Sequence, residues 1–204
     1  MKKKPESILG KIWYFIWYDD SMLSWIVNII LAFVLIKYII YPGLGFFFGT
    51  QFPVVAVVSN SMEHHGSFYE WWNSQEDFYL EHNITDIDFR EFAFTHGFNK
   101  GDIMVLIGTA SHKINVGDVI VYHAKKPYPI IHRVISIRDT GGELYFETKG
   151  DNNKFQIKGF DLDEKNVSSE SYIGRAVFRI PFLGYIKIWF VEVMSWIGLG
   201  GLFT

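Results

Sequence analysis

The sequence contains no cysteine and no large excess of either charge. Without cysteine, the chain cannot form a disulfide framework, a thiolate metal site or a cysteine nucleophile, so redox pairs, zinc ribbons and thiol proteases are excluded. Its 22 acidic residues slightly outnumber 19 basic ones, and the resulting net charge of −3 argues against a nucleic acid partner. Apolar residues, in contrast, make up 49% of the 204 residues, and two long runs of them lie near the ends of the chain.

The first apolar run predicts a membrane anchor. Residues 22–41 contain a single charged side chain, Lys37. At about 1.5 Å per residue, a helix of this length crosses the roughly 30 Å hydrocarbon core of a bilayer. Lysines are frequent in the tail that precedes it, residues 1–21, whereas no lysine or arginine occurs between Tyr38 and Phe89. This asymmetry predicts a cytoplasmic N-terminal tail and an extracytoplasmic domain.

The second apolar run, residues 185–204, closes the sequence. Lys187 and Glu192 interrupt it, and glycines weaken its end as a helix. The run is compatible with a second transmembrane helix, a helix that lies flat on the bilayer, or a helix packed on the domain. Its hydrophobicity favours contact with the membrane, so we predict a membrane-associated segment.

Between these runs, residues 42–184 predict a mainly β domain with antiparallel sheets. Gly101-Asp102 and Gly117-Asp118 each introduce an apolar strand, and we expect these two strands to be neighbours; the glycines at 141–142 predict a hairpin turn. The runs rich in β-branched and apolar residues, bounded by turn residues, are 53–58, 102–107, 118–123, 130–138, 143–149 and 173–180.

Residues 63–99 interrupt the β pattern. Ser67 and Thr85 are each followed three residues later by an acid, which is typical of a capping box at a helix start. Aromatic residues follow at helical spacing. We therefore predict a helical, aromatic insertion. It is either a small additional core or a lid or flap that touches the membrane.

Three segments carry side chains suited to hydrolysis. Ser61 follows the apolar strand 53–58, His132 lies within a β-branched strand, and Asp151 lies on a turn at a strand end. A serine, a histidine and an acid are the residue types from which a nucleophile, its general base and an orienting group are built. Each alone is more often structural, because a serine on a turn usually bonds the backbone. Their value as evidence therefore comes from their occurring together.

These segments resemble the type I signal peptidases of the archaeal and ER branch, which uses serine and histidine where the bacterial branch uses serine and lysine. The segments that match, in the family's order, are SNSM with Ser61, KGDIM, VGDVIVY, IIHRVI with His132, TKGDNN with Asp151, and YIGRAVFRIPFLGY. They cover the domain apart from the insertion. The resemblance implies a signal-peptidase-like antiparallel fold and a membrane-bound serine endopeptidase that removes N-terminal signal peptides from exported proteins.

The resemblance also implies catalytic roles. Ser61 is expected to be the nucleophile and His132 the general base that takes its proton. The oxyanion hole is expected to combine the Ser59 hydroxyl with the Ser61 backbone N–H.

The third catalytic residue departs from the family pattern. The family has an acid in the Gly-Asp-Asn-Asn turn, here Asp151, and a second acid about six residues later, where this chain has Ile157. The next acids lie in the longer run KFQIKGFDLDEKN. We expect Asp161 to pair with His132 and Asp151 to shape the turn. Pairing through Asp151 or Asp163, or a dyad without an acid, are the alternatives.

No cofactor is implied. Glu63, His64 and His65 lie beside the nucleophile but lack the spacing of a zinc peptidase helix, so we predict no metal.

The expected partners are preproteins that carry signal peptides, the lipid bilayer and the secretion translocon. The expected location is the cell membrane, or the ER membrane in a eukaryote. A processing protease of narrower specificity, or a non-catalytic membrane-anchored binding or assembly module on the same fold, are the competing functions.

Overall fold

The computed structural model describes residues 6–196, so Lys2, Lys3 and Lys4 of the predicted tail and residues 197–204 lie outside the described residues. The chain divides into two compact units, residues 1–47 and 48–204. The N-terminal unit is helical. Its elements are α1 (Ile8–Tyr18), α2 (Met22–Leu35), η1 (Ile36–Ile40) and the greater part of α3 (Tyr41–Phe48).

The last three of these elements form one apolar helix. It runs over Met22–Phe48, contains an 18-residue stretch with a mean hydropathy of 2.3, and is the one helix in the described part of the chain that is long and apolar enough to cross a membrane. It continues beyond the predicted end at residue 41, although Pro42 cannot donate a backbone hydrogen bond. The π-helical turn η1 ends two residues before Pro42, and a widened turn of this kind accommodates such an interruption without ending the helix.

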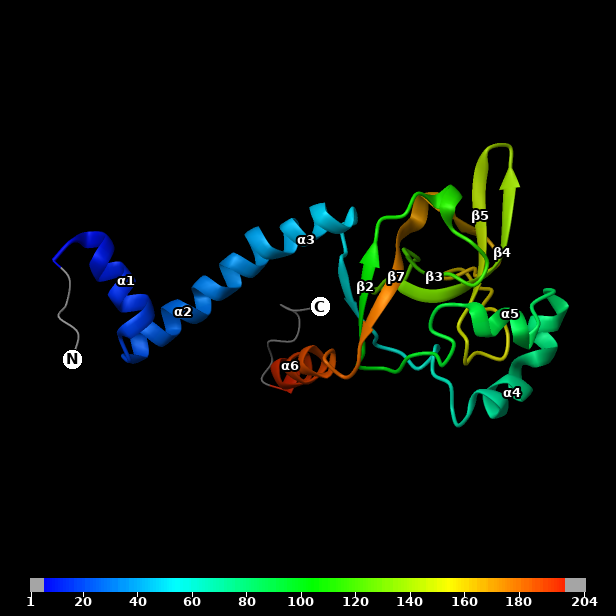
Figure 1. Ribbon diagram of the computed structural model, residues 1–204, viewed down its shortest axis with the longest axis horizontal. Helices are drawn as coiled ribbons and strands as arrows, with labels where there is room; N and C mark the ends of the chain where they lie inside the picture. Colours follow the sequence, from blue (N-terminus) through cyan, green and yellow to red (C-terminus); the bar gives the residue numbers. More distant parts are fainter. Residues whose placement is uncertain (1–5, 197–204) are drawn as a thin grey trace. The chain divides into compact units, whose positions relative to one another are not determined.

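The second unit carries a curled sheet in which, among the described residues, seven antiparallel strands follow the order β1-β2-β7-β3-β4-β5-β6 (Figure 1). The predicted fold class is confirmed. The elements of this unit are β1 (Val54–Ala56), α4 (Phe68–Glu81), α5 (Asp86–Glu91), β2 (Ile103–Ile107), η2 (Ser111–Lys113), β3 (Val119–Tyr122), β4 (Ile130–Thr140), β5 (Glu143–Lys149), β6 (Val167–Ser168), η3 (Ser169–Ser171), β7 (Tyr172–Ile180) and α6 (Tyr185–Trp196).

The two Gly-Asp turns are built alike. Gly101 and Gly117 have φ of 90° and 94°, which a residue with a side chain rarely adopts. In each turn the following aspartate accepts a backbone hydrogen bond from the residue three positions earlier, at 2.9 Å for both Asp102 and Asp118. Both aspartates therefore stabilise the turn that precedes their strand. The strands that they introduce, β2 and β3, were expected to be neighbours, and this expectation is wrong. Strand β7 lies between them and pairs with both.

The insertion is helical, as predicted. Ser67 and Thr85 both form complete capping boxes, at the starts of α4 and α5. These two helices lie together at one end of β4 (Figure 1), and their aromatic side chains form a buried cluster that Ile135 of β4 closes. The insertion thus has a small core of its own packed on the sheet, which is the first of the two alternatives.

The C-terminal run begins as a helix. Tyr185 packs over Gly101, where a Cβ atom would lie 2.1 Å from its ring, so this end of α6 is held against the β2 turn. Ile186, Trp189 and Trp196 of α6 are exposed apolar side chains. The membrane association of residues 185–204 stays a prediction, and its last part falls outside the described residues.

Candidate active site

Ser61 and His132 meet where β1 leaves the sheet. The residues after β1, which we call the nucleophile loop (58–62), place the Ser61 Oγ 2.9 Å from the His132 Nε2. The Ser59 hydroxyl lies 3.1 Å from the Ser61 Oγ on the same loop. His132 is held on β4 opposite Ile120 of β3, and its side chain is only 5% exposed. The structure therefore brings together the two residues expected to be nucleophile and base.

The acid on His132 is Glu164, which the sequence did not single out. Its Oε1 accepts a hydrogen bond from the His132 Nδ1, and its Oε2 accepts one from the Ile157 backbone N–H at 2.5 Å. The Glu164 side chain is fully buried. Ile157, at the position where the family's second acid was expected, thus contributes its backbone to hold the acid that is present.

The expected partner of His132, Asp161, lies elsewhere. Its side chain is 54% exposed and faces Lys126 at 3.6 Å. Asp163 accepts a hydrogen bond from the Lys165 backbone N–H at 3.1 Å. The pairing of Asp161 with His132 is therefore corrected to Glu164. The physical reason is a hairpin, with a bridge between Lys158 and Asp163, that turns Asp161 outward and brings Glu164 inward.

Asp151 lies at the centre of a separate buried charge cluster. Arg133 binds it with both ends of its guanidinium, at 2.9 Å from Nε to Oδ1 and 2.7 Å from Nη2 to Oδ2. The Tyr79 hydroxyl donates to Oδ1 at 3.1 Å, and the His64 Nε2 lies 3.0 Å from Oδ2. Burial alone would raise the pKa of Asp151, but the Arg133 charge and the hydrogen bonds from His64 and Arg133 outweigh it, so this pKa lies well below its usual range.

The turn that carries Asp151 touches the catalytic pair directly. We call residues 150–153 the acid turn. The Asn152 backbone N–H donates to the Ser61 carbonyl oxygen at 2.8 Å, and its side chain donates to the Asn60 carbonyl oxygen at 3.1 Å. A Cβ atom on Gly150 would lie 2.8 Å from the Ser61 carbonyl oxygen and 2.9 Å from the His132 Nε2, so only glycine fits there. The contacts of this turn with the catalytic pair thus come from Gly150 and Asn152, while the Asp151 carboxylate is bound to Arg133, Tyr79 and His64.

The Asp151→Asn variant should be strongly destabilised. It leaves Arg133, which is fully buried, without its counter-charge, and breaking a buried ion pair on one side costs about 3–5 kcal/mol. Denaturant unfolding of the full chain in neutral detergent measures this loss. Asp161→Asn, which alters an exposed pair, is the matched control and should change the free energy of unfolding by no more than about 0.5 kcal/mol.

The pH dependence of the same measurement has a defined sign. Because the pKa of Asp151 is lowered by folding, its stabilising contribution is fully present above the pKa of the unfolded carboxyl, near ~3.9, and is lost as the pH falls below that value. Asp151→Asn should therefore show a shallower loss of stability below about pH 4 than the wild type. Equal destabilisation by the two asparagine variants would contradict the ion-pair assignment.

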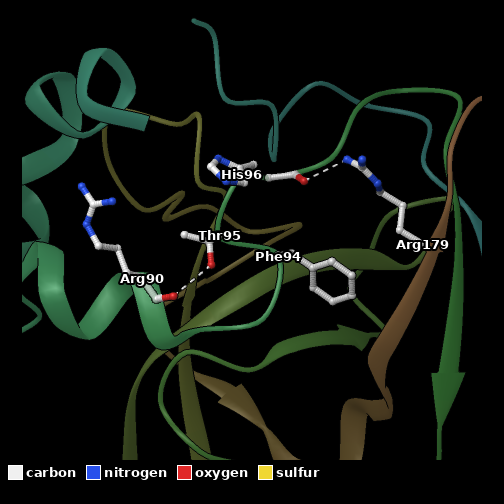
Figure 2. Close-up of a pocket in the computed structure, with 6 residues that line it drawn as sticks. Arg90, Phe94, Thr95, His96 and Arg179 are labelled. Atoms are coloured by element: carbon white, nitrogen blue, oxygen red, sulfur yellow. Dashed lines mark hydrogen bonds between the residues drawn. The ribbon is translucent and has the colours of Figure 1, made fainter. Parts of the chain in front are cut away.

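An open pocket of about 460 Å³ lies where the insertion returns to β2. Figure 2 shows Arg90 and Arg179 on opposite sides of it, with the Arg179 guanidinium donating to the Gly97 carbonyl oxygen at 3.1 Å. The residues that line it are Arg90, Phe94, Thr95, His96, Gly97 and Arg179. Neither Ser61 nor His132 is among them. The hydrogen-bonded geometry of Ser61 and His132, rather than this hollow, therefore locates the candidate active site.

A serine hydroxyl, an imidazole and a buried carboxylate in one hydrogen-bonded chain are the arrangement found in serine hydrolases. Comparison with curated proteins agrees with this class. The chain is 30% identical over 185 residues to the signal peptidase complex catalytic subunit sec11 of Schizosaccharomyces pombe, covering 88% of this chain and 89% of that protein. No protein-family model matches the chain.

Two further relatives carry the same description. The signal peptidase complex catalytic subunit SEC11 of Plasmodium falciparum is 28% identical over 85% of this chain and 78% of that protein. For the human SEC11C subunit the identity is 26%, over 73% of this chain and 62% of that protein's length. The chain belongs to the family of signal peptidase complex catalytic subunits, the ER-type branch of the type I signal peptidases. It is therefore a peptidase, and the predicted family and enzyme class are confirmed.

Proposed function

We propose that this chain removes N-terminal signal peptides from exported proteins, with Ser61 as nucleophile, His132 as general base and Glu164 as the acid that orients the base. The observation that carries the assignment is the 2.9 Å hydrogen bond between the Ser61 Oγ and the His132 Nε2, with Glu164 bound to the other ring nitrogen. Family membership supports the choice of substrate.

The proposed reaction proceeds in two halves. The Ser61 Oγ attacks the scissile carbonyl carbon while the His132 Nε2 takes its proton, and the imidazolium then protonates the leaving amine as the C–N bond breaks. Water next attacks the acyl-enzyme ester, with His132 again accepting a proton, and the protonated imidazole returns that proton to the Ser61 Oγ. Glu164 keeps the Nδ1 protonated, so that the Nε2 lone pair faces Ser61.

The oxyanion that forms in each half needs hydrogen-bond donors. The Ser61 backbone N–H and the Ser59 hydroxyl are the donors in this proposal, and the 3.1 Å separation of the Ser59 and Ser61 hydroxyls supports it, because it places Ser59 beside the attacking atom.

The substrate is proposed to bind as an extended strand. Within the described residues, β1 pairs only with β2, so its other edge offers free backbone groups to a peptide, and the chain after β1 runs towards Ser61. Pairing of this kind brings alternate side chains of a substrate to the enzyme surface, where small side chains beside the cut are expected to fit.

The test is cleavage of a full-length preprotein by the full chain in neutral detergent. Mass spectrometry of the product should give one new N-terminus, directly after the signal peptide. A substrate that stays intact, or that is cut at scattered positions, would refute the assignment.

The proposed location is a membrane, with the N-terminal tail on the cytoplasmic side and the catalytic domain across the bilayer. The apolar helix Met22–Phe48 and the lysine asymmetry around it support this topology. In sealed vesicles with the domain outside, added protease should digest the domain and spare the N-terminal tail; the reverse pattern would overturn the topology.

The relatives are named as subunits of a complex, which supports assembly of this chain with further subunits. Delivery of substrates by the secretion translocon remains our proposal.

The competing non-catalytic function is disfavoured by one observation. A binding module has no need to keep a serine, a histidine and a buried carboxylate in hydrogen-bond contact, since burying the Glu164 charge is costly without a function. A processing protease of narrower specificity would use the same site and differs only in its substrates.

A further inference from the structure

The insertion, residues 63–99, reaches the acid turn through one face of α4. The Trp71 Nε1 donates to the Asp151 carbonyl oxygen at 3.2 Å, and the Tyr79 hydroxyl donates to the Asp151 Oδ1 at 3.1 Å. Between them, the Gln75 Oε1 accepts a hydrogen bond from the Lys149 Nζ at 2.8 Å. Trp71, Gln75 and Tyr79 are spaced four residues apart, so they line one side of the helix, and all three are buried.

Lys149 connects the same helix to the backbone of the turn. Besides Gln75, its ammonium group donates to the carbonyl oxygens of Gly150 at 3.1 Å and Asp151 at 3.3 Å. An ammonium group has three hydrogens, and these three acceptors account for them. Removing the Gln75 acceptor would leave a buried N–H donor without a partner, which is costly in a site with little access to water.

The second half of the insertion holds the other side of Asp151. Its backbone carbonyl oxygens at Ala93 and Phe94 accept hydrogen bonds from the Arg133 guanidinium, at 2.8 Å and 3.1 Å. The Phe89 ring lies 4.6 Å from the same guanidinium. Arg133 in turn holds the Asp151 carboxylate. The insertion therefore contacts Asp151 directly and also fixes the orientation of its counter-charge.

The acid turn transmits this contact to the catalytic pair. It is hydrogen-bonded to the Ser61 carbonyl oxygen, and at Gly150 it packs against both Ser61 and the His132 ring without space for one more carbon atom. A displacement of the turn must therefore displace the nucleophile loop. In a near-attack geometry a shift of about 1 Å can lower the rate by about 100-fold.

These contacts exceed what an insertion that serves only as an additional core requires. Such an insertion would bury its aromatic rings, as this one does against Ile135, and would leave its polar atoms in water or satisfy them internally. Here the indole N–H, the amide oxygen and the phenol hydroxyl of three residues on α4 all point to the acid turn or to Lys149.

We propose that α4 is a positioning element for the reaction, in which Trp71, Gln75 and Tyr79 hold the acid turn against the nucleophile loop so that Ser61 stays aligned with His132. None of the three touches the reacting atoms. The proposal rests on the proposed function of Ser61 and His132, and it assigns the insertion an effect on kcat rather than on KM.

Tyr79→Phe and Tyr69→Phe form the decisive pair of variants. Both remove one hydroxyl from α4, but the Tyr79 hydroxyl is buried on Asp151, whereas Tyr69 is 65% exposed. Preprotein cleavage by the full chain in neutral detergent should show kcat lowered about tenfold for Tyr79→Phe, with KM within about twofold of wild type. Tyr69→Phe should match the wild type in both constants.

Gln75→Leu and Gln75→Glu provide a second test with a built-in rescue. Leucine removes the acceptor for Lys149, whereas glutamate keeps an oxygen at the same place. Gln75→Leu should lower kcat by about tenfold per folded molecule, and Gln75→Glu should stay within about threefold of wild type. Each rate is divided by the folded fraction, which is measured by tryptophan fluorescence during thermal melting. If Tyr79→Phe does not fold, the two variants of Gln75 test the positioning role of α4 without it.

The outcomes separate this proposal from the function on which it rests. If Ser61→Ala cleaves the preprotein as the wild type does, the proposed active site is wrong. If Ser61→Ala is inactive while Tyr79→Phe and Gln75→Leu keep wild-type kcat per folded molecule, the active site stands and the positioning role of α4 is overturned. A change confined to the melting temperature would likewise reduce α4 to a structural element.

Discussion

Replacing Ser61 with alanine should lower kcat for preprotein cleavage on the order of 10⁴-fold or more, while the protein stays folded. The Ser61 Oγ is the atom in hydrogen-bond contact with the His132 Nε2, and without it no acyl-enzyme can form. The cleavage that remains comes from bound water and the oxyanion donors alone. Stability should change little, since the hydrogen bond of this residue to the acid turn uses its backbone carbonyl oxygen.

Ser59→Ala is the informative companion of this variant. It removes the neighbouring hydroxyl, 3.1 Å from the Ser61 Oγ, and leaves the nucleophile in place. Loss of one oxyanion donor should lower kcat by about 10²–10³-fold, which is less than the loss of the nucleophile. If Ser61→Ala retained more activity than Ser59→Ala, the two roles would be exchanged.

Glu164→Gln should lower kcat by about 10²–10⁴-fold with little change in shape. The amide has no charge with which to stabilise the imidazolium formed during catalysis, and if its NH₂ group faces the His132 Nδ1 it favours the wrong tautomer. Activity should not be restored by raising the pH, because a glutamine does not regain the charge.

Asp161→Asn is the control for Glu164→Gln. It removes a carboxylate from the same hairpin, but that carboxylate faces Lys126 and is half exposed. The kcat of this variant for preprotein cleavage should lie within about twofold of the wild-type value. Wild-type activity in Glu164→Gln would make the site a Ser-His dyad, whereas a large loss in Asp161→Asn alone would mean that the hairpin rearranges when substrate binds.

The parts of the site that were predictable from the sequence depend on local patterns. Ser61 follows an apolar strand, and His132 is embedded in one, so short motifs place both within the domain. The turns at Asp102 and Asp118 could be predicted for the same reason. In each, the aspartate after the glycine accepts a hydrogen bond from the backbone N–H three residues earlier, which is a local interaction.

Glu164 could not be found in this way because its role depends on the register of a hairpin. Glu164 and Ile157 pair through the Glu164 backbone N–H at 2.9 Å. Successive side chains of an extended chain point to opposite faces. The side chains of the neighbouring residues Asp163 and Glu164 therefore point in opposite directions, and a shift of the pairing by one residue would exchange them. The family spacing of about six residues offered no guide across a longer loop. The run DLDEKN contained the correct acid, and only the pairing decides which of its carboxylates is buried.

Arg133 was also beyond prediction. A charged residue in a strand normally reaches solvent, but this one is fully buried and bonds Asp151, Ala93, Phe94 and Gly117. Its acceptors come from the acid turn, from the insertion and from a loop, and no local pattern connects these segments. The order of strands is a similar case, because the pairing of β7 with both β2 and β3 depends on contacts that are distant in the sequence.

The short edge strand β1 also bears on how the protein behaves without substrate. An open strand edge can recruit identical chains and begin aggregation. Here only three residues belong to the strand, and Pro53 directly before it has no backbone N–H to donate. The row of unpaired backbone groups on β1 is therefore too short to start the stacking of further chains. The same shortness limits how firmly a peptide backbone is held, which favours rapid dissociation of the cleaved product and repeated turnover.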